Sequence, residues 1–508
     1  MKIPQPIQRA SRECADAVWL HAPRLLFAAT LFSALLVACV GEKRPPNILL
    51  ITLDTTRPDH LGPYGHEKAH TPNLDRFSGH ARVYENAYAT SSWTLASHAS
   101  ILTGLLPRQH GAQSVPKGPN RSLGYGVRPL SDSFLTLAEI LSRAGYRTGA
   151  VVAGPALRSE LGTDQGFEIY SDELNGPLRL FNGKRAEETT DLALDVLKQF
   201  GDAPFFLFVN YFDPHAPYAP PVDLSPPTGQ TPASAEADVE SGEKTGLDSP
   251  KKPTEPFSLP RLYIEKLSAN ATPRSREASP PEELTEIHKQ LSAYDSEIAY
   301  LDHHLGRLLD AIDRLPPGEE TWVIITADHG ESFGEHYFMS HGAHLYEDNV
   351  RVPLIVRPAR SETGQRISQS VQNHRLFGSV LEMAGQPLPE WALPLPNEGE
   401  VSEIILEVHR SESNILIGGD FFDRDLFSLL APPFKLIRSS KGDVELFDLS
   451  SDPEELDNLV SKNPELAAQM AERLSVLLDE RPPLYPEPES LELRKETEEA
   501  LRAMGYIE

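Results

Sequence analysis

The strongest pattern along the chain is a set of short apolar runs separated by segments of helical periodicity. Three runs, at residues 47–53, 204–210 and 321–327, are almost unbroken and rich in β-branched or aromatic side chains. Runs of this kind predict strands that are buried on both faces of a sheet. Residues 147–154 and 351–356 are two further strand candidates.

Between these runs, the apolar positions recur with the spacing of amphipathic helices. Helices are predicted over residues 71–80, 134–144, 186–200 and 282–315. Strands that alternate with helices in this way form a mostly parallel sheet covered by helices on both faces. The predicted fold class is therefore α/β, with a three-layer α/β/α domain over about residues 45–395.

The pattern changes after about residue 400. The segments EIILEVH, FKLIRSS and DVELFDLS alternate apolar and polar positions, which favours a small antiparallel sheet. With a helix packed on that sheet, they predict a C-terminal α+β subdomain over residues 400–480. Residues 484–508 then form a polar C-terminal helix.

Two polar stretches of the predicted domain carry weaker expectations. Residues 222–283 are rich in Pro, Ser, Glu and Lys, so we interpret them as an insertion with little regular structure. His303 and His304, on the helix that follows, are interpreted as solvated helix residues.

Polar side chains follow the three buried runs directly. Asp54 ends the first run, Asp213 and His215 follow the second, and Asp328-His329 follow the third. Because the carboxyl ends of parallel strands share one edge of a sheet, these groups are expected to converge there. Carboxylate and imidazole ligands without thiolate suit Mn, Mg, Ca or Zn. A site for one divalent metal ion is therefore predicted.

A further histidine, His341, lies in the loop Ser340-His341-Gly342. His215 and His341 are candidates for binding a negatively charged ester. Alternatively, they hold a second metal ion together with Asp213, and the Asp-x-His spacing fits both interpretations equally well.

The stretch ATSSWTLASHASILTGLLPRQHG, residues 89–111, changes from a hydroxyl-rich turn to a helical pattern. The free N–H groups of a helix start suit an anion, and the hydroxyls beside them suit a nucleophile. A metal ion next to a hydroxyl lowers its pKa and makes it nucleophilic near neutral pH.

The N-terminal residues predict export. Residues 25–39 form an apolar run that follows basic residues and is too short to span a bilayer comfortably, which fits a signal peptide. Leu36-Val37-Ala38-Cys39 resembles a bacterial lipobox, so residues 1–39 are expected to be a signal peptide ending in a lipidated Cys39. A plain signal peptide with a chance Cys is the alternative. The lipobox predicts a lipoprotein of the bacterial cell envelope, anchored in the membrane and facing the periplasm or the outside.

Composition excludes two kinds of chemistry. The formal net charge of −27 over 508 residues, without a cluster of Lys and Arg, argues against nucleic acid as a partner. The other cysteine, Cys14, lies in the predicted signal peptide. Cleavage before Cys39 therefore leaves no thiol to act as a nucleophile or a metal ligand.

From Asn47 to about Leu478, the chain resembles the sulfatase family within the alkaline-phosphatase superfamily. The resemblance rests on these segments in this order: NILLITLDTTRPDHLGPYG, TPNLDRF, ASILTGLLPRQHG, GYRTGAVV, FFLFVNYFDPHAPY, YDSEIAYLD, TADHGESFGEH, HGAHLYEDNVRVPLIV and ELFDLSSDPEELDNL. It implies a three-layer α/β/α domain, a smaller C-terminal domain with an antiparallel sheet, and hydrolysis or transfer at a sulfate or phosphate ester.

The resemblance also assigns roles to individual positions. The metal-ligand positions of the family are occupied by Asp54, Asp328 and His329. Thr94 stands at the position of the nucleophile that contacts the metal, with Ser91, Ser92 and Ser97 in supporting or capping roles. The positions that contact the anionic group are occupied by His215 and His341.

Three departures from the family pattern bear on the chemistry. Sulfatases carry C/S-x-P-x-R, whose first residue becomes formylglycine, but this chain has Thr94-Leu95-Ala96-Ser97-His98. Thr55 replaces the second acid of the usual Asp-Asp pair, and a Gly-Lys-Trp-His element is missing at residues 150–154. A Thr nucleophile with this ligand set resembles the phosphodiesterases and phosphoglycerol or phosphoethanolamine transferases of the superfamily.

Three hypotheses follow. The first is a lipid-anchored, metal-dependent hydrolase or transferase of phosphate esters that uses Thr94. The second is a sulfate-ester hydrolase that acts without formylglycine. The third is a non-catalytic envelope lipoprotein that binds anionic ligands in the same cleft.

Overall fold

The computed structural model is built around an eight-stranded sheet with the strand order β12-β2-β11-β8-β1-β7-β5-β6. It describes residues 44–116, 125–174, 183–221, 279–316, 320–360, 363–396, 399–400, 403–411, 414–415, 419–485 and 493–503. Cys39, the expected signal peptide and nearly all of the expected insertion lie outside these residues.

The apolar runs form the centre of the sheet, as predicted. Strand β1 (Asn47–Leu53) lies between β7 (Phe205–Tyr211) and β8 (Thr321–Thr326) and is parallel to both. β5 (Arg147–Val152) and the short β6 (Ile169–Ser171) extend the parallel arrangement beyond β7. The carboxyl ends of β8, β1 and β7 therefore lie next to one another at one edge of the sheet.

The other half of the sheet is mixed. β11 (Arg351–Arg357) is antiparallel to β8 and to β2 (Arg82–Tyr88), and β12 (Gln365–Gln372) pairs in parallel with β2. The apolar pattern did not predict β2 or β12. β12 is the edge strand, and only its last two residues are buried, so it carries no apolar run.

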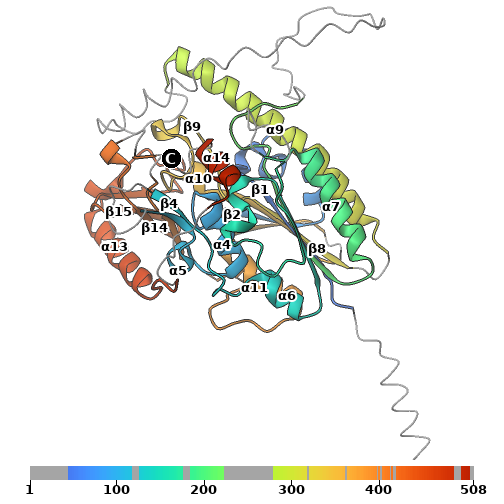
Figure 1. Ribbon diagram of the computed structural model, residues 1–508. Coiled ribbons are helices and arrows are strands. Elements are labelled where there is room, and N and C mark those ends of the chain that lie inside the picture. Colours follow the sequence, from blue (N-terminus) through green and yellow to red (C-terminus); the bar gives the residue numbers. More distant parts are fainter. Residues whose placement is uncertain are drawn as a thin grey trace, which may run out of the picture. The chain divides into compact units, whose positions relative to one another are not determined.

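Helices cover both faces of the sheet, which confirms the three-layer prediction (Figure 1). The helices that pack on one face are α3 (Pro72–Ser78), α7 (Ala186–Phe200) and α9 (Pro281–Asp313). The helices that pack on the other face are α4 (Thr94–Thr103), α6 (Leu137–Arg143) and α11 (Leu376–Met383). In the part of the chain that is described, no helix is long and apolar enough to cross a membrane.

One helix residue differs from the expectation. His303 is exposed on α9, but His304 is buried, with 7% of its surface exposed. The reason is that α7 packs along this part of α9, where the Thr190 hydroxyl donates a hydrogen bond of 3.2 Å to the backbone carbonyl of His304.

The C-terminal subdomain contains the expected antiparallel sheet. Its strands, in spatial order, are β13 (Ile404–Val408), β14 (Leu426–Ala431), β15 (Phe434–Ser439) and β16 (Val444–Asp448). Helix α13 (Pro464–Asp479) packs on one face of this sheet, and α14 (Lys495–Ala503) follows. The other face packs against a loop of the α/β domain, which includes Phe338 and Tyr346.

Candidate active site

The hydroxyl of Thr94 lies at the start of a helix, as the sequence predicted. Thr94 is the first residue of α4, after Trp93 in an extended conformation, and its side chain is fully buried. Its Oγ1 lies 3.1 Å from Nε2 of His329. The positive end of the helix dipole therefore lies beside this hydroxyl, where it stabilises developing negative charge.

Neighbouring hydroxyls hold the helix start in place. The Ser92 hydroxyl donates to the carbonyl of His344 at 2.9 Å, and the Ser97 hydroxyl donates to the carbonyl of Asp328 at 2.7 Å. The side chain of Trp93, which precedes α4, makes no capping hydrogen bond. Ser92 and Ser97 thus connect α4 to the loops that follow β8, and their supporting or capping role stays a prediction.

Asp54, Asp328 and His329 form a group with the composition of a metal site. One ligand atom from each residue lies within 4.8 Å of those of the other two, and all three side chains are fully buried. Asp54 Oδ1 has no hydrogen-bond partner. Burial, and then the charge of Asp328, raise the pKa of Asp54 well above its ordinary value. Two buried carboxylates that repel each other, each with one oxygen that has no hydrogen-bond partner, fit a divalent cation.

The hydrogen bond to His329 fixes which of its ring nitrogens carries the proton. Nδ1–H donates to the carbonyl of Gly330 at 2.9 Å, so Nε2 is left with a lone pair. This lone pair faces Asp328 Oδ2, 3.3 Å away, and the Thr94 hydroxyl. Burial lowers the pKa of His329 to about 3, with the charge of His341 adding to the effect. A neutral imidazole with a free Nε2 is the form that binds metals.

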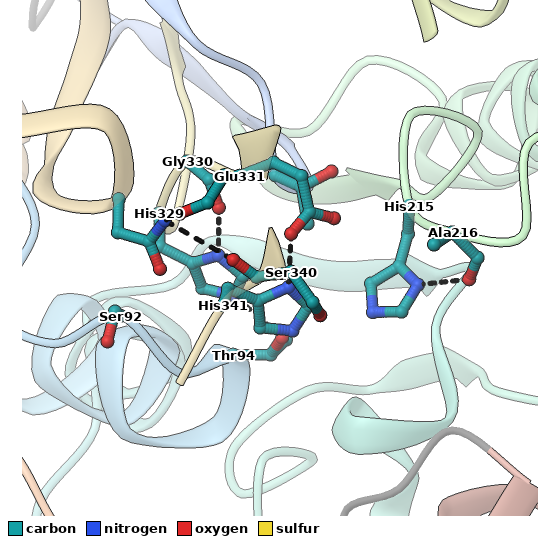
Figure 2. A network of polar contacts seen from close by, with 12 residues as sticks. Ser92, Thr94, His215, Ala216, His329, Gly330, Glu331, Ser340 and His341 are labelled. Atoms are coloured by element: carbon teal, nitrogen blue, oxygen red, sulfur yellow. Dashed lines mark hydrogen bonds and ion pairs between the residues drawn. The ribbon is translucent and has the colours of Figure 1, made fainter. Parts of the chain in front are cut away.

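His341 lies next to His329, and a carboxylate that the sequence argument had not selected orients it. The two imidazole rings are 4.3 Å apart between centroids. Nδ1 of His341 lies 3.1 Å from Oε1 of Glu331, and the Tyr218 hydroxyl donates to Oε2 at 3.1 Å. Glu331 is fully buried, and burial raises its pKa to about 7. In Figure 2, the His329 and His341 rings lie close together, with Glu331 above them and Thr94 below.

His215 flanks this group from the loop after β7. Its ring centroid is 5.0 Å from that of His341, and its Nδ1–H donates to the carbonyl of Ala216 at 2.6 Å. Burial, and then the charge of His341, lower the pKa of His215 to about 3. In Figure 2, His215 stands to one side of the His329 and His341 pair. Its role in contacting an anionic group stays a prediction.

Asp213 has a different set of partners. Its Oδ1 accepts the backbone N–H of Ala186 at 3.0 Å and lies 3.8 Å from Arg185 Nη1. The carboxylate thus faces the N-terminus of α7, where negative charge is favourable. These contacts involve Oδ1 alone, and Oδ2 is buried without a hydrogen-bond partner. The second metal site stays a prediction.

The departures from the family pattern take up specific places in the structure. Thr55 has a positive φ of 53°, which is rare for a β-branched residue, and its N–H donates to Asp328 Oδ1 at 3.3 Å. His98 is fully buried, with Nδ1–H donating to the carbonyl of Thr94 at 2.9 Å. Burial lowers the pKa of His98. A neutral ring therefore stands where the family pattern has an Arg.

Two buried carboxylates and an imidazole at the ends of parallel strands, beside a hydroxyl on a helix start, have the composition expected of a metal-dependent ester hydrolase. The family model described as Sulfatase matches residues 46–386. The chain belongs to the sulfatase family of the alkaline-phosphatase superfamily, and it is a hydrolase.

Individual relatives cover most of the chain. It is 27% identical to the "Uncharacterized sulfatase YidJ" of Escherichia coli over 441 residues, which cover 82% of this chain and 83% of that protein. It is 24% identical to the "Multifunctional alkaline phosphatase superfamily protein PehA" of Trinickia caryophylli, covering 83% and 92%. Among solved structures, the phosphonate monoester hydrolase SpPMH from Silicibacter pomeroyi has the same fold, with a TM-score of 0.63 at 19% identity, covering 86% and 95%.

Proposed function

We propose that this protein hydrolyses phosphate esters, mono- or diesters, with Thr94 as the nucleophile. The observation that carries the proposal is the position of the Thr94 hydroxyl. Its Oγ1 lies 3.1 Å from Nε2 of His329, which is one member of the Asp54, Asp328 and His329 group. A divalent metal ion held by these residues would lower the pKa of the hydroxyl and neutralise charge on the ester oxygens.

The reaction proceeds in two displacements at phosphorus. Thr94 Oγ1 forms a bond to phosphorus while the bond to the leaving alcohol breaks, and the alcohol leaves with a proton. Water then attacks the same phosphorus, the bond to Oγ1 breaks, and the threonine hydroxyl is regenerated. Each displacement is in line, so positioning and charge stabilisation supply most of the rate enhancement. His215 and His341 are placed to orient the ester.

The nature of the nucleophile favours phosphate over sulfate. Formylglycine releases sulfate by collapse of a hemiacetal, without a second attack at sulfur. Threonine cannot form this aldehyde, so its adduct has to be attacked at the central atom, which metal-assisted displacement achieves readily at phosphorus. The name of SpPMH, which refers to phosphonate monoesters, supports this choice.

Sulfate esters are the second candidate, because the family model and YidJ are described as sulfatases. In this case Thr94 acts by a formylglycine-independent route. The two candidates differ in the central atom of the ester, and parallel assays separate them.

The test is a panel of 4-nitrophenyl sulfate, 4-nitrophenyl phosphate and bis(4-nitrophenyl) phosphate, assayed with Mn²⁺, Mg²⁺, Ca²⁺ or Zn²⁺. We expect the phosphate esters to be turned over faster than the sulfate. Thr94→Ala should lower kcat by about a thousandfold or more. Thr103→Ala is the matched control, since it removes a hydroxyl at the far end of the same helix. Sulfate turnover well above phosphate turnover would favour the second candidate.

We also propose that the chain is a lipid-anchored envelope protein through Cys39, on the basis of the sequence alone. Expression of the full chain and of Cys39→Ala in a bacterial host, followed by membrane fractionation and mass spectrometry of the N-terminus, tests this. A lipidated Cys39 in the membrane fraction is expected. An unmodified, cleaved N-terminus in wild-type protein would rule the anchor out.

A further inference from the structure

The loop that carries His341 has an unusual backbone. It runs over residues 334–346, between β9 (Ser332–Phe333) and α10 (Glu347–Val350). His336, Tyr337 and Ser340 have φ values of 51°, 66° and 71°. Non-glycine residues in this region carry strain, and such conformations persist only where the surroundings determine them.

The loop contains the short strand β10 (Met339–Ser340), which pairs with β9, and its remaining contacts include several with the C-terminal subdomain. Phe338 and Tyr346 lie in one buried apolar cluster with residues of β13 to β16. The ring of His336 stacks on Tyr346 at 3.9 Å between centroids, and its Nε2–H donates to the carbonyl of Glu454 at 2.9 Å. Asn414 donates to the carbonyl of Gly342, the neighbour of His341, at 3.0 Å.

The end of the loop is tied to the subdomain by a buried ammonium group. Lys435, on β15, is fully buried, and its Nζ lies 2.9 Å from Glu347 Oε1 and 2.8 Å from Glu455 Oε1. The backbone N–H of Glu347 donates to Glu455 Oε2 at 2.7 Å. Although burial alone would lower it, the pKa of Lys435 is raised by the charges of Glu347 and Glu455. The charged form is therefore maintained inside the protein.

From Glu347, a short path of contacts reaches His341. The next residue, Asp348, accepts a hydrogen bond from the Ser332 hydroxyl, and its backbone carbonyl accepts the N–H of Glu331 at 3.1 Å. Glu331 in turn contacts Nδ1 of His341 at 3.1 Å. The Lys435 network thus supports both the loop and the carboxylate that orients the imidazole.

We propose that Lys435 is a positioning residue of the active site, which holds the loop 334–346, and with it His341, in place through Glu347. The C-terminal subdomain is then part of the catalytic apparatus, although it contributes no residue to the metal group. The proposal rests on the proposed function only in assigning His341 to the anionic substrate.

Hydrogen exchange measured by mass spectrometry tests the positioning without needing activity. Lys435→Met leaves the buried Glu455 and the partly buried Glu347 uncompensated. Glu347→Ala removes the carboxylate that joins the end of the loop to Lys435, but keeps the Lys435–Glu455 pair and the backbone bond from residue 347 to Glu455. It therefore remains informative if Lys435→Met fails to fold. In both variants, amides of residues 334–346 should exchange about tenfold faster or more, while β1 and β8 are unchanged. Arg473→Met is the control, because it removes a partly exposed ion pair with Glu403 from the same subdomain.

A binding measurement adds the functional readout. We expect both variants to bind inorganic phosphate about tenfold more weakly by calorimetry in the presence of Mn²⁺, with the affinity for Mn²⁺ itself retained. Unchanged exchange in the loop of a folded Glu347→Ala protein would overturn the proposal. Equal loss of protection in β1 and β8 would also overturn it, because that result indicates general destabilisation. If no ester is turned over, the proposed function fails, and the exchange result still decides the role of Lys435.

Discussion

Among single residues, the protonation states of the imidazoles around Thr94 follow from their hydrogen bonds. Nδ1 of His329 and Nδ1 of His215 each donate to a backbone carbonyl, and burial keeps both rings neutral. The positive charge that an anionic ester needs is therefore not supplied by these rings. It has to come from a metal ion and from the start of α4.

Replacement of Glu331 by Gln tests the orientation of His341. Gln keeps the size of the side chain but loses the charge that faces Nδ1 of His341. We expect kcat/KM for bis(4-nitrophenyl) phosphate to fall by about 10- to 100-fold, as is usual for residues that orient active-site ligands. Steady-state kinetics with circular dichroism as a folding check measures this. Unchanged kinetics in Glu331→Gln would contradict the orienting role.

Most residues of the candidate metal group could be predicted from the sequence, because they lie directly after predicted strands. Asp54, Asp328 and His329 each follow an apolar run, and adjacent strands bring them within 4.8 Å. Glu331 was missed, since a carboxylate in a polar loop has no periodic signal. Its position two residues after His329, in the segment DHGE, was the available indication. The same limit applies to His304, whose burial depends on how α7 packs on α9.

Among secondary-structure elements, the apolar runs predicted the central strands, and the mixed edge was not predictable in the same way. β1, β7 and β8 are buried on both faces, so hydrophobicity alone defines them. β12 is exposed over most of its length, and its pairing with β2 depends on the whole sheet. The strained loop 334–346 is likewise determined by contacts with the C-terminal sheet, which are distant in sequence.

His409, a partly buried histidine directly after β13, gives a pH-dependent contribution to stability. His409 Nε2 lies 3.6 Å from Glu407 Oε2, and Nδ1 lies 3.7 Å from Asp425 Oδ1. Burial alone would lower the pKa of His409, but these two carboxylates raise it to about 9. Since the pKa in the unfolded chain is about 6.5, the stabilisation is complete below about pH 6.5 and is lost as the pH rises through about 9.

We therefore expect the free energy of unfolding to be larger for wild-type protein than for His409→Gln, with the largest difference near pH 6. The difference should shrink towards zero above about pH 9. Urea unfolding at several pH values, followed by circular dichroism, measures this. A difference that grows with pH would contradict the assigned ion pairs.

For the whole molecule, the candidate metal group joins parts of the chain that are far apart in sequence. Asp54 follows β1 and Asp328 follows β8, so a bound cation would connect neighbouring strand ends and relieve the repulsion between two buried carboxylates. The C-terminal subdomain contacts the loop that carries His341. Under the proposals above, stability, metal binding and substrate positioning would therefore be coupled.

Asp54→Asn tests the role of Asp54 as a metal ligand, because its effect on the melting temperature should differ without and with Mn²⁺. Without metal, the variant should melt at the same temperature as wild-type protein or higher, because one of two repelling carboxylates is gone. Mn²⁺ at a hundredfold excess over Kd should stabilise wild-type protein by about 2.7 kcal/mol and so raise its melting temperature. The melting temperature of Asp54→Asn should not change. Asp310→Asn, which removes a surface carboxylate, is the control and should keep the full shift. Equal Mn²⁺-induced shifts in wild-type protein and Asp54→Asn would exclude Asp54 as a ligand.

The central claim is that Thr94 forms a covalent bond to phosphorus, and intermediate trapping tests it most directly. Wild-type protein is quenched in acid during turnover of bis(4-nitrophenyl) phosphate, digested, and analysed by mass spectrometry. We predict a 4-nitrophenyl phosphate ester on Thr94, which is absent from Thr94→Ala and present in Thr103→Ala. Full turnover by Thr94→Ala, or an adduct on a different residue, would contradict the account.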